Sequence, residues 1–200
     1  MNARDILRIH AASLALILTT AQANGSETHA PALETYKIDS SHSAITFKVR
    51  HFFTQVPGSF ANFQGTIKLD KTNPANNSAE AVIQVASVDT NDAKRDSHLK
   101  TEDFFEATAF PAMTFESTRW EALGGNKHRV TGNLTIKETT KEVVLDVLML
   151  GSGEKRGKHL TGWQATTTLD RTDFGVSYGR GVVGADVAVE INVEAVRQGG

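Results

Sequence analysis

The stretch from Asp39 to Ser43 places the groups of a catalytic triad next to one another in the sequence. It reads Asp-Ser-Ser-His-Ser, so a carboxylate, several hydroxyls and an imidazole lie close along the chain. A nucleophilic serine needs its base and carboxylate to converge in space, and neighbours on an extended chain rarely face one another. The sequence also has no Gly-x-Ser-x-Gly nucleophile elbow. A hydrolase is therefore an open alternative that no motif indicates.

His51 is a second residue with chemical potential, and it ends a regular row. Ile45, Phe47, Val49 and His51 occupy alternate positions, with polar residues between them. This alternation predicts a half-buried β-strand with one apolar face. An imidazole on an apolar face fits a ligand pocket better than a filled core. A hydrogen-bonded histidine in the core or at its rim is the alternative.

Three further residues are candidates for contact with a polar head group. Arg171 offers several N–H donors in a fixed fork, which suits an anionic or polar ligand group. Asp173 follows it closely, and the alternative for this pair is a turn or a strand-face ion pair. His98 opens a segment with helical character, where packing or capping is the alternative.

Metal and thiol chemistry find no support in the sequence. The chain has no cysteine, which excludes disulfides, thiolate metal sites and cysteine nucleophiles. Its 7 histidines show neither His-x-His nor His-Glu-x-x-His spacing, so we predict no metal site. Glu102, Asp103 and Glu106 are interpreted as the solvated face of a helix.

These residues lie on a chain whose pattern is almost entirely that of strands. Alternating segments separated by short turns predict an all-β fold, and one helical insert is expected at 91–101, extending irregularly to 105. An eight-stranded antiparallel barrel is favoured over a sandwich, because the strands are long and closure removes every sheet edge. The expected strands are 36–38, 44–53, 60–69, 79–88, 113–118, 129–137, 142–150, 161–169 and 186–196.

The first residues have the composition of a secretory signal peptide. A basic start with Arg4 and Arg8 precedes the apolar run 11–18 and an Ala-x-Ala site, so cleavage is expected after Ala23. Residues 24–34 are expected to form a disordered leader, and residues 35–197 the folded domain. We expect a periplasmic protein, with no stable membrane insertion because no apolar run is long enough to span a bilayer.

The charge balance argues against nucleic acid as a partner. The full chain carries a formal charge of −2, and removal of residues 1–23 changes it to −3. Nucleic-acid binding depends on Lys and Arg that neutralise phosphates, and the sequence has no concentrated basic patch. The short cluster 155–159 is interpreted as a solvated hairpin loop.

Four motifs follow one another along the chain. They are Asp39-x-x-His42-Ser43 with Phe47-x-Val49-x-His51, Gly58-x-Phe60-x-x-Phe63-x-Gly65, His98-Leu99-x-x-x-Asp103-Phe104-Phe105 with Phe110-Pro111, and Arg171-x-Asp173-Phe174-Gly175. Their order and spacing resemble the YceI-like family of exported bacterial lipid-binding proteins, from about Tyr36 to Glu194. The resemblance implies a lipocalin-like barrel with an apolar tunnel for a polyisoprenoid, a quinone or a fatty-acid derivative. Family members are often dimers, so a homodimer is one expected state, and no catalytic activity or cofactor is implied.

The expected function is to bind a long-chain lipid for transport, storage or sequestration. For any single phenylalanine, plain core packing is the alternative to lining a tunnel. Two other functions stay open: an enzyme acting on a lipid or quinone head group, and an interaction module with a filled barrel. The residues expected to contact the ligand are Phe47, Val49, His51, Phe60, Phe63, His98, Leu99, Phe104, Phe105, Phe110, Met113, Phe115, Trp163, Arg171, Asp173 and Phe174.

Overall fold

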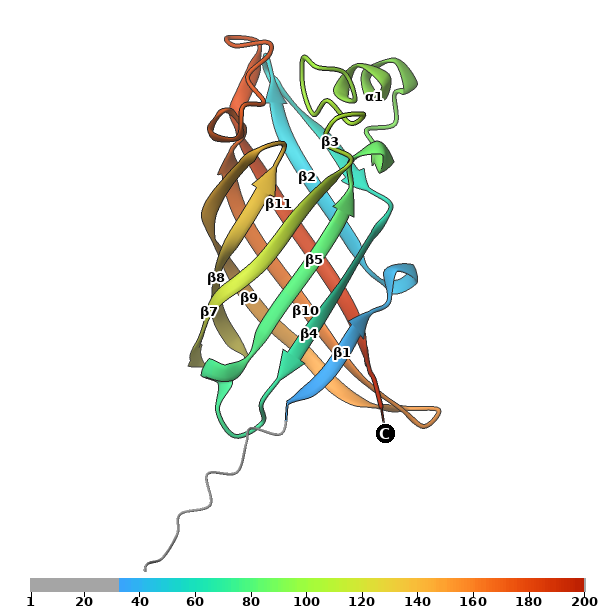
Figure 1. The fold of residues 1–200 in the computed structure, drawn as a ribbon, viewed down its shortest axis with the longest axis vertical. Helices are drawn as coiled ribbons and strands as arrows, with labels where there is room; N and C mark the ends of the chain where they lie inside the picture. The colour runs from blue at the N-terminus through green and yellow to red at the C-terminus, as the bar shows by residue number, and fades with distance from the viewer. Residues whose placement is uncertain (1–32, 200) are drawn as a thin grey trace, which may run out of the picture. The chain divides into compact units, whose positions relative to one another are not determined.

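The computed structural model describes residues 33–199, and these form an antiparallel β-barrel (Figure 1). The predicted signal peptide 1–23 lies outside the described residues, as does the predicted leader up to residue 32. The elements are β1 (Glu34–Ile38), β2 (Ala44–His51), β3 (Thr54–Phe60), β4 (Phe63–Leu69), β5 (Ser78–Gln84), β6 (Val88–Asp89), α1 (Ala93–Leu99), β7 (Ala112–Gly124), β8 (Lys127–Ile136), β9 (Thr139–Lys155), β10 (Lys158–Asp170) and β11 (Val183–Arg197).

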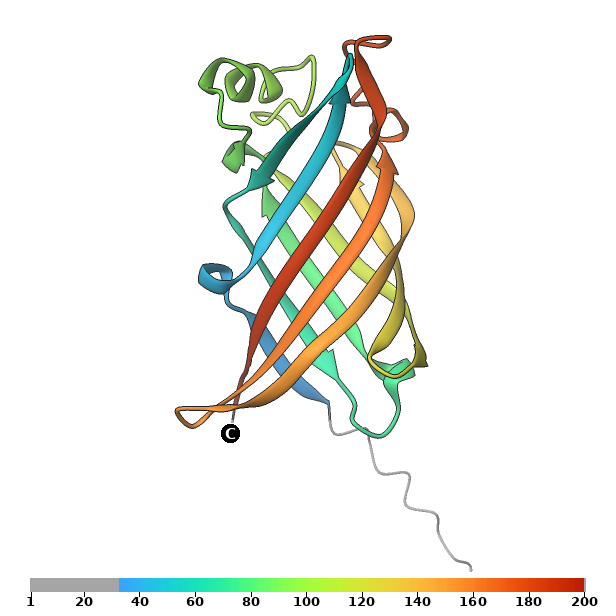
Figure 2. The same cartoon turned by 180° about the vertical axis from the view of Figure 1, so that it is seen from behind.

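Eight strands close the ring, as the sequence predicts. Their order is β1-β4-β5-β7-β8-β9-β10-β11, and β11 pairs back with β1. Figure 2 shows the continuous wall that β9, β10, β11 and β2 form on the other side. Closure leaves the ring strands with neighbours on both sides, so the barrel needs no disulfide to protect sheet edges.

Strand alternation in β11 explains how one strand serves both the interior and the surface. Val187, Val189 and Ile191 face inward, whereas Ala188 and Glu190 between them are exposed. A period of two places successive side chains on opposite faces of the sheet. Since one face is apolar and the other polar, a register shift of one residue would reverse both faces and is strongly disfavoured.

One position in the ring is shared by β1 and β2, which are separated by a short 3-10 turn, Ser40–His42. β11 pairs with β2 through its first half and with β1 through its last residues. At the interruption, the Ser43 hydroxyl donates to the carbonyl of Glu194 and accepts from its N–H. The Asp39 N–H also donates to that carbonyl, so the turn stays attached to β11.

β3 is a strand that the sequence did not predict. It contains Pro57 and Gly58, and both residue types are depleted in strands. For this reason the composition of the segment does not predict a strand. Proline is tolerated at a sheet edge, where its missing N–H removes no ladder bond. In the described residues, only Ser59 and Phe60 of β3 pair with a second strand, the short β6, so most of β3 is such an edge.

The helical insert lies at the same end of the barrel as the β2–β3 hairpin (Figure 1). The sequence predicts a helix over 91–101, and α1 occupies Ala93–Leu99 within that range. Asp92 caps it by accepting a hydrogen bond from the Arg95 N–H at 3.0 Å. Turns follow to residue 109, in place of a continued helix.

The barrel interior divides into two apolar clusters. The cluster toward β1 is closed by large side chains, among them Tyr36, Trp120, Trp163 and Val130. Trp120 and Trp163 pack edge to face with ring centroids 5.7 Å apart. The other cluster lies beneath the helical insert and contains most of the phenylalanines. The cavity described below lies mainly in this second half.

Candidate functional site

A cavity of about 230 Å³ occupies the half of the barrel beneath the insert. Within the described residues, its lining is apolar apart from Thr46, Thr167 and Arg171. Such a wall offers contact area and shape with very few polar partners, which suits an aliphatic or prenyl chain. The lining residues are Ile38, Ile45, Thr46, Phe47, Val49, Phe60, Phe63, Ala81, Ile83, Leu99, Phe104, Phe105, Met113, Phe115, Leu134, Ile136, Val143, Leu145, Thr167, Leu169, Arg171, Phe174, Val176, Val183, Val187, Val189, Ile191 and Val193.

Two glycines on the inner surface make room for the largest rings of the wall. Gly58 of β3 lies directly opposite Phe47 of β2, and a Cβ at this position would approach Phe47 Cε1 to 2.8 Å. Gly132 of β8 plays the same part for Phe115, whose ring atoms would lie within 2.6 Å of a Cβ. Both rings therefore lie flat over a glycine instead of projecting across the cavity.

Arg171 is the one charged residue of the lining in residues 33–199, and its donors are engaged by the backbone. It lies in the 3-10 turn Arg171–Phe174 and is only 8% exposed. Its Nε donates to the Gly184 carbonyl at 2.8 Å, Nη1 to Val176 at 2.6 Å and Nη2 to Val183 at 3.0 Å. Burial lowers the pKa of the guanidinium from its ordinary value, and Asp170 opposes that shift. The side chain holds the loop 175–184 in place at the cavity.

An aromatic cluster joins the insert to that same loop. His98, Phe104 and Tyr178 meet with ring centroids 5.1–5.3 Å apart. His98 Nε2 lies 2.7 Å from Asp103 Oδ2, which fixes the imidazole at the end of α1. Phe104 belongs to the cavity wall, so this cluster covers the interior at the insert end.

Most of the predicted contact residues lie in the cavity wall, and five lie elsewhere. The wall contains Phe47, Val49, Phe60, Phe63, Leu99, Phe104, Phe105, Met113, Phe115, Arg171 and Phe174. Those outside it are His51, His98, Phe110, Trp163 and Asp173.

Each of these five residues lies outside the cavity wall for a different physical reason. His51 lies at the end of β2, past the cavity, and packs edge to face on Phe52. Trp163 belongs to the filled half of the interior. Asp173 is exposed and lies 3.9 Å from the Lys141 ammonium, and Phe110 lies beneath the Lys137 ammonium. The candidates of the enzyme alternative are His51, His98, Arg171 and Asp173, and the structure gives each of them different partners.

Most of the wall that β8 to β11 supply was not predicted from the sequence. These residues are aliphatic, whereas phenylalanine was the main sequence signal for the predicted contacts. The period-two alternation along each of these strands was the signal that identifies them. They include Leu134, Ile136, Val143, Leu145, Leu169, Val187, Val189, Ile191 and Val193.

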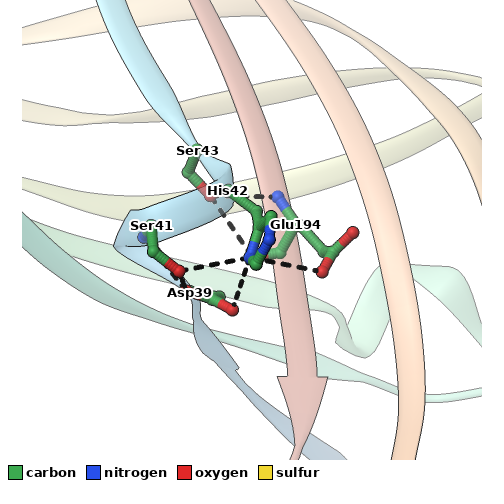
Figure 3. Close-up of polar contacts among 5 residues, drawn as sticks. All are labelled: Asp39, Ser41, His42, Ser43 and Glu194. Atoms are coloured by element: carbon green, nitrogen blue, oxygen red, sulfur yellow. Dashed lines mark hydrogen bonds and ion pairs between the residues drawn. The ribbon is translucent and has the colours of Figure 1, made fainter. Parts of the chain in front are cut away.

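The Asp39–Ser43 stretch forms a hydrogen-bonded turn on the barrel surface and not a triad (Figure 3). Ser41 Oγ and Asp39 Oδ2 both approach the same nitrogen, His42 Nδ1, at 3.2 and 3.0 Å. A triad needs the serine at one ring nitrogen and the carboxylate at the other. The Ser41 hydroxyl also donates to Asp39 Oδ1 at 2.6 Å, so it is fixed by the carboxylate.

Hydrogen bonding and charge pairing shift the pKa values of the two titratable groups of this turn in opposite directions. Hydrogen bonds from Ser41, and then His42, lower the pKa of Asp39 to about 2. The Asp39 carboxylate raises the pKa of His42, with a smaller contribution from Glu194, whose Oε1 lies 3.9 Å from Nδ1. The side-chain atoms of these three residues that could bind a metal lie within 4.8 Å of one another, but Asp39 and His42 are already hydrogen-bonded to each other. We therefore assign the turn a structural role.

Across residues 33–199, no helix combines the length and apolar content that a membrane span requires.

Comparison with known proteins agrees with this architecture. The family model described as the YceI-like domain matches residues 36–195. The UPF0312 protein ECA1782 of Pectobacterium atrosepticum is 37% identical over 167 residues, covering 82% of this chain and 86% of that protein. Protein YceI of Shigella flexneri is 35% identical over 167 residues, and the match covers 82% of this chain and 87% of the Shigella protein.

Solved structures show the same barrel. BcnA of Burkholderia cenocepacia superimposes with a TM-score of 0.73 at 27% identity, covering 78% of this chain and 98% of BcnA. A polyisoprenoid binding domain from Saccharophagus degradans gives a TM-score of 0.61 at 15% identity and covers 82% of this chain and 98% of that domain, a likeness in fold alone. The sequence and fold comparisons together show that this chain belongs to the YceI-like family.

Proposed function

We propose that this protein binds a long-chain amphiphile, such as a polyisoprenoid, in the cavity beneath the insert. The observation that carries the proposal is the almost wholly apolar wall of that cavity. Each buried methylene contributes about 0.8 kcal/mol, so even a short engaged segment of chain gives useful affinity. The polyisoprenoid-binding domain that shares this fold supports the choice of ligand class.

The size of the cavity sets how the chain is held. Its volume of about 230 Å³ is below the roughly 300–1,000 Å³ of typical ligand pockets. A long tail would fill this space and either extend beyond it or displace lining side chains such as Met113 and Leu99. Met is suited to that role because its unbranched side chain adapts to irregular space.

We propose a carrier or sequestering role outside the cytoplasm, following export and cleavage after Ala23. The support is the sequence of residues 1–23 and the water-excluded site, which would protect a greasy chain between membranes. The mass of the protein recovered from the periplasm tests the export step. It should correspond to a chain that begins at Asn24, and a full-length chain confined to the cytoplasm would contradict it.

A pair of substitutions on one strand tests the binding site. Val189 of β11 faces the cavity, and Ala188 next to it faces solvent. Val189→Phe fills the cavity and should weaken uptake of a fluorescent prenyl or fatty-acyl probe by about tenfold or more, which is roughly 1.4 kcal/mol. Ala188→Phe adds the same ring outside and should bind as the parent does. Equal binding by both variants would show that the probe does not enter the cavity.

A further inference from the structure

The tip of the β2–β3 hairpin carries two phenylalanine side chains that the barrel does not use. Phe53 is fully exposed, at 103% of its reference area, and Phe52 is 51% exposed. Neither ring lines the cavity or belongs to an apolar cluster. Adjacent exposed aromatic rings are unfavourable in water, so such a pair indicates a surface that meets a partner.

The backbone of the turn makes the choice of residue still more unusual. Phe52 has φ of +49°, in the left-handed region that favours glycine. Two-residue hairpin turns with positive φ at their first position normally hold glycine, asparagine or aspartate there. The Arg50 guanidinium donates to the Phe52 carbonyl at 2.7 Å and supports the strained residue. A bulky ring at this position costs stability, which points to a role for the ring itself.

The tip lies next to the insert end of the cavity. Val49, which lines the cavity, lies on the same strand only two positions before His51, the last residue of β2. His51 pairs with Val183, another lining residue, and the Phe52 N–H donates to the Val182 carbonyl at 2.9 Å. Figure 1 shows the hairpin tip beside the insert and the loop that precedes β11.

The hairpin and the loop before β11 carry exposed positive charge. No Asp or Glu occurs between Ser40 and Leu69, whereas Lys48 and Arg50 are exposed on the hairpin. Arg180 is exposed on the adjoining loop. Asp103 lies against His98 and Asp173 near Lys141. Asp186 of β11 and Glu102 of the insert are exposed acidic residues at the same end, so the positive charge is confined to the hairpin and the loop before β11.

We propose that this hairpin tip docks the insert end of the barrel on a lipid bilayer. Phe52 and Phe53 enter the boundary between head groups and acyl chains, and Lys48 and Arg50 meet anionic lipid phosphates. Apolar rings beside cationic side chains are the combination that binds such an interface. The inference rests on the proposed lipid-binding function, because docking lets a chain pass from bilayer to cavity without crossing water.

The test compares two exposed apolar sites in a vesicle flotation assay. The parent protein should float with vesicles of equal parts phosphatidylethanolamine and phosphatidylglycerol, and more weakly with phosphatidylcholine alone. Phe52→Gly combined with Phe53→Ser should reduce the bound fraction about tenfold. Glycine relieves the positive φ, so this variant should unfold at the same temperature as the parent or higher. Leu150→Ser, which removes an exposed side chain from β9, should float like the parent.

Three outcomes would overturn the proposal. One is a parent protein that binds neither kind of vesicle. Another is a double variant that floats as well as the parent. The third is a concentration-dependent dimer that the double variant loses in sedimentation, because a second copy would then cover the tip.

A fluorescence measurement separates docking from failure to fold. Phe53→Trp adds one exposed indole to the buried Trp120 and Trp163, so its emission should shift to the blue on vesicles and be quenched by brominated lipid. An unshifted spectrum would contradict docking. Uptake of the prenyl or acyl probe in the absence of vesicles reports the cavity independently. If the parent protein docks on vesicles but takes up no probe, the proposed lipid-binding function is rejected while the docking surface still stands.

Discussion

At the scale of single residues, the cavity depends on glycines that lie against aromatic rings. Gly58→Ala would place a methyl group in the space of the Phe47 ring, which then has to turn into the cavity or displace β3. Overpacking of this kind costs about 1–3 kcal/mol. We expect a lower unfolding temperature together with weaker uptake of the prenyl probe.

Gly151 supplies the matched control for this substitution. It also lies in a strand, β9, but a Cβ there would meet no atom within 4 Å. Gly151→Ala should leave probe uptake unchanged and should not lower the unfolding temperature. If Gly58→Ala behaves in the same way, the Phe47 ring does not depend on that glycine.

Arg171 tests whether a buried charge inside the cavity wall is structural. Arg171→Met removes the donors for three loop carbonyls, and the free energy of unfolding should fall by about 3 kcal/mol. Arg171→Lys should restore only part of it, because one ammonium cannot reproduce the planar fork. Arg180→Met, at an exposed position, should stay within about 0.5 kcal/mol of the parent in urea denaturation. Equal stability of the Arg171 and Arg180 variants would contradict this assignment.

The Asp39–His42 pair should have a measurable pH signature. Because the folded pKa of His42 is raised above 6.5, its contribution to stability is complete below that pH and is lost as pH rises through the folded value. The Asp39 contribution is complete above its ordinary pKa of 3.8 and is lost as pH falls toward about 2. Asp39→Asn should lower the pKa of His42 in an NMR titration. Glu194→Gln should lower it less, since that oxygen is farther away. An unchanged His42 pKa in Asp39→Asn would contradict the pairing.

At the scale of elements, the insert acts as a cover held by aromatic contacts. Tyr178 packs on both His98 and Phe104, so it joins the insert to the loop before β11. Tyr178→Ala should speed amide hydrogen exchange in residues 93–105 and leave the barrel strands protected. Leu123→Ala, an exposed apolar site at the end of β7, should not change exchange in the insert. Unchanged exchange in Tyr178→Ala would show that other contacts hold the cover.

Sequence patterns predicted the ring of strands and the helical insert because each has a strong local signal. The alternation of Ile45, Phe47 and Val49 is an example. β3 was missed because Pro57 and Gly58 are accepted there only through its position at an edge, which is a tertiary property.

The candidate site was harder to predict than the fold. Periodicity assigns a face to each residue but not a height along the barrel. His51 and Trp163 were thus assigned to the cavity, though one lies beyond the wall and the other in the filled half. Whether Arg171 has free donors also depends on the path of the loop 175–184, which no local pattern specifies.

At the scale of the whole barrel, the division of the interior explains how a stable protein can retain a cavity. The half with Trp120, Trp163 and Tyr36 is packed, and this core supports the ring of strands. The other half has a continuous apolar wall around about 230 Å³. Stability and binding therefore depend on different layers of the same strands.

The most direct test of the central claim is to identify what the native protein carries. Protein isolated from membrane-bearing cells without detergent should yield, on organic extraction and mass spectrometry, a single-chain amphiphile in near-stoichiometric amount. The Val189→Phe variant should yield much less of it, and Ala188→Phe the same amount as the parent. A parent protein that is consistently free of lipid and takes up no prenyl or acyl probe would contradict the claim.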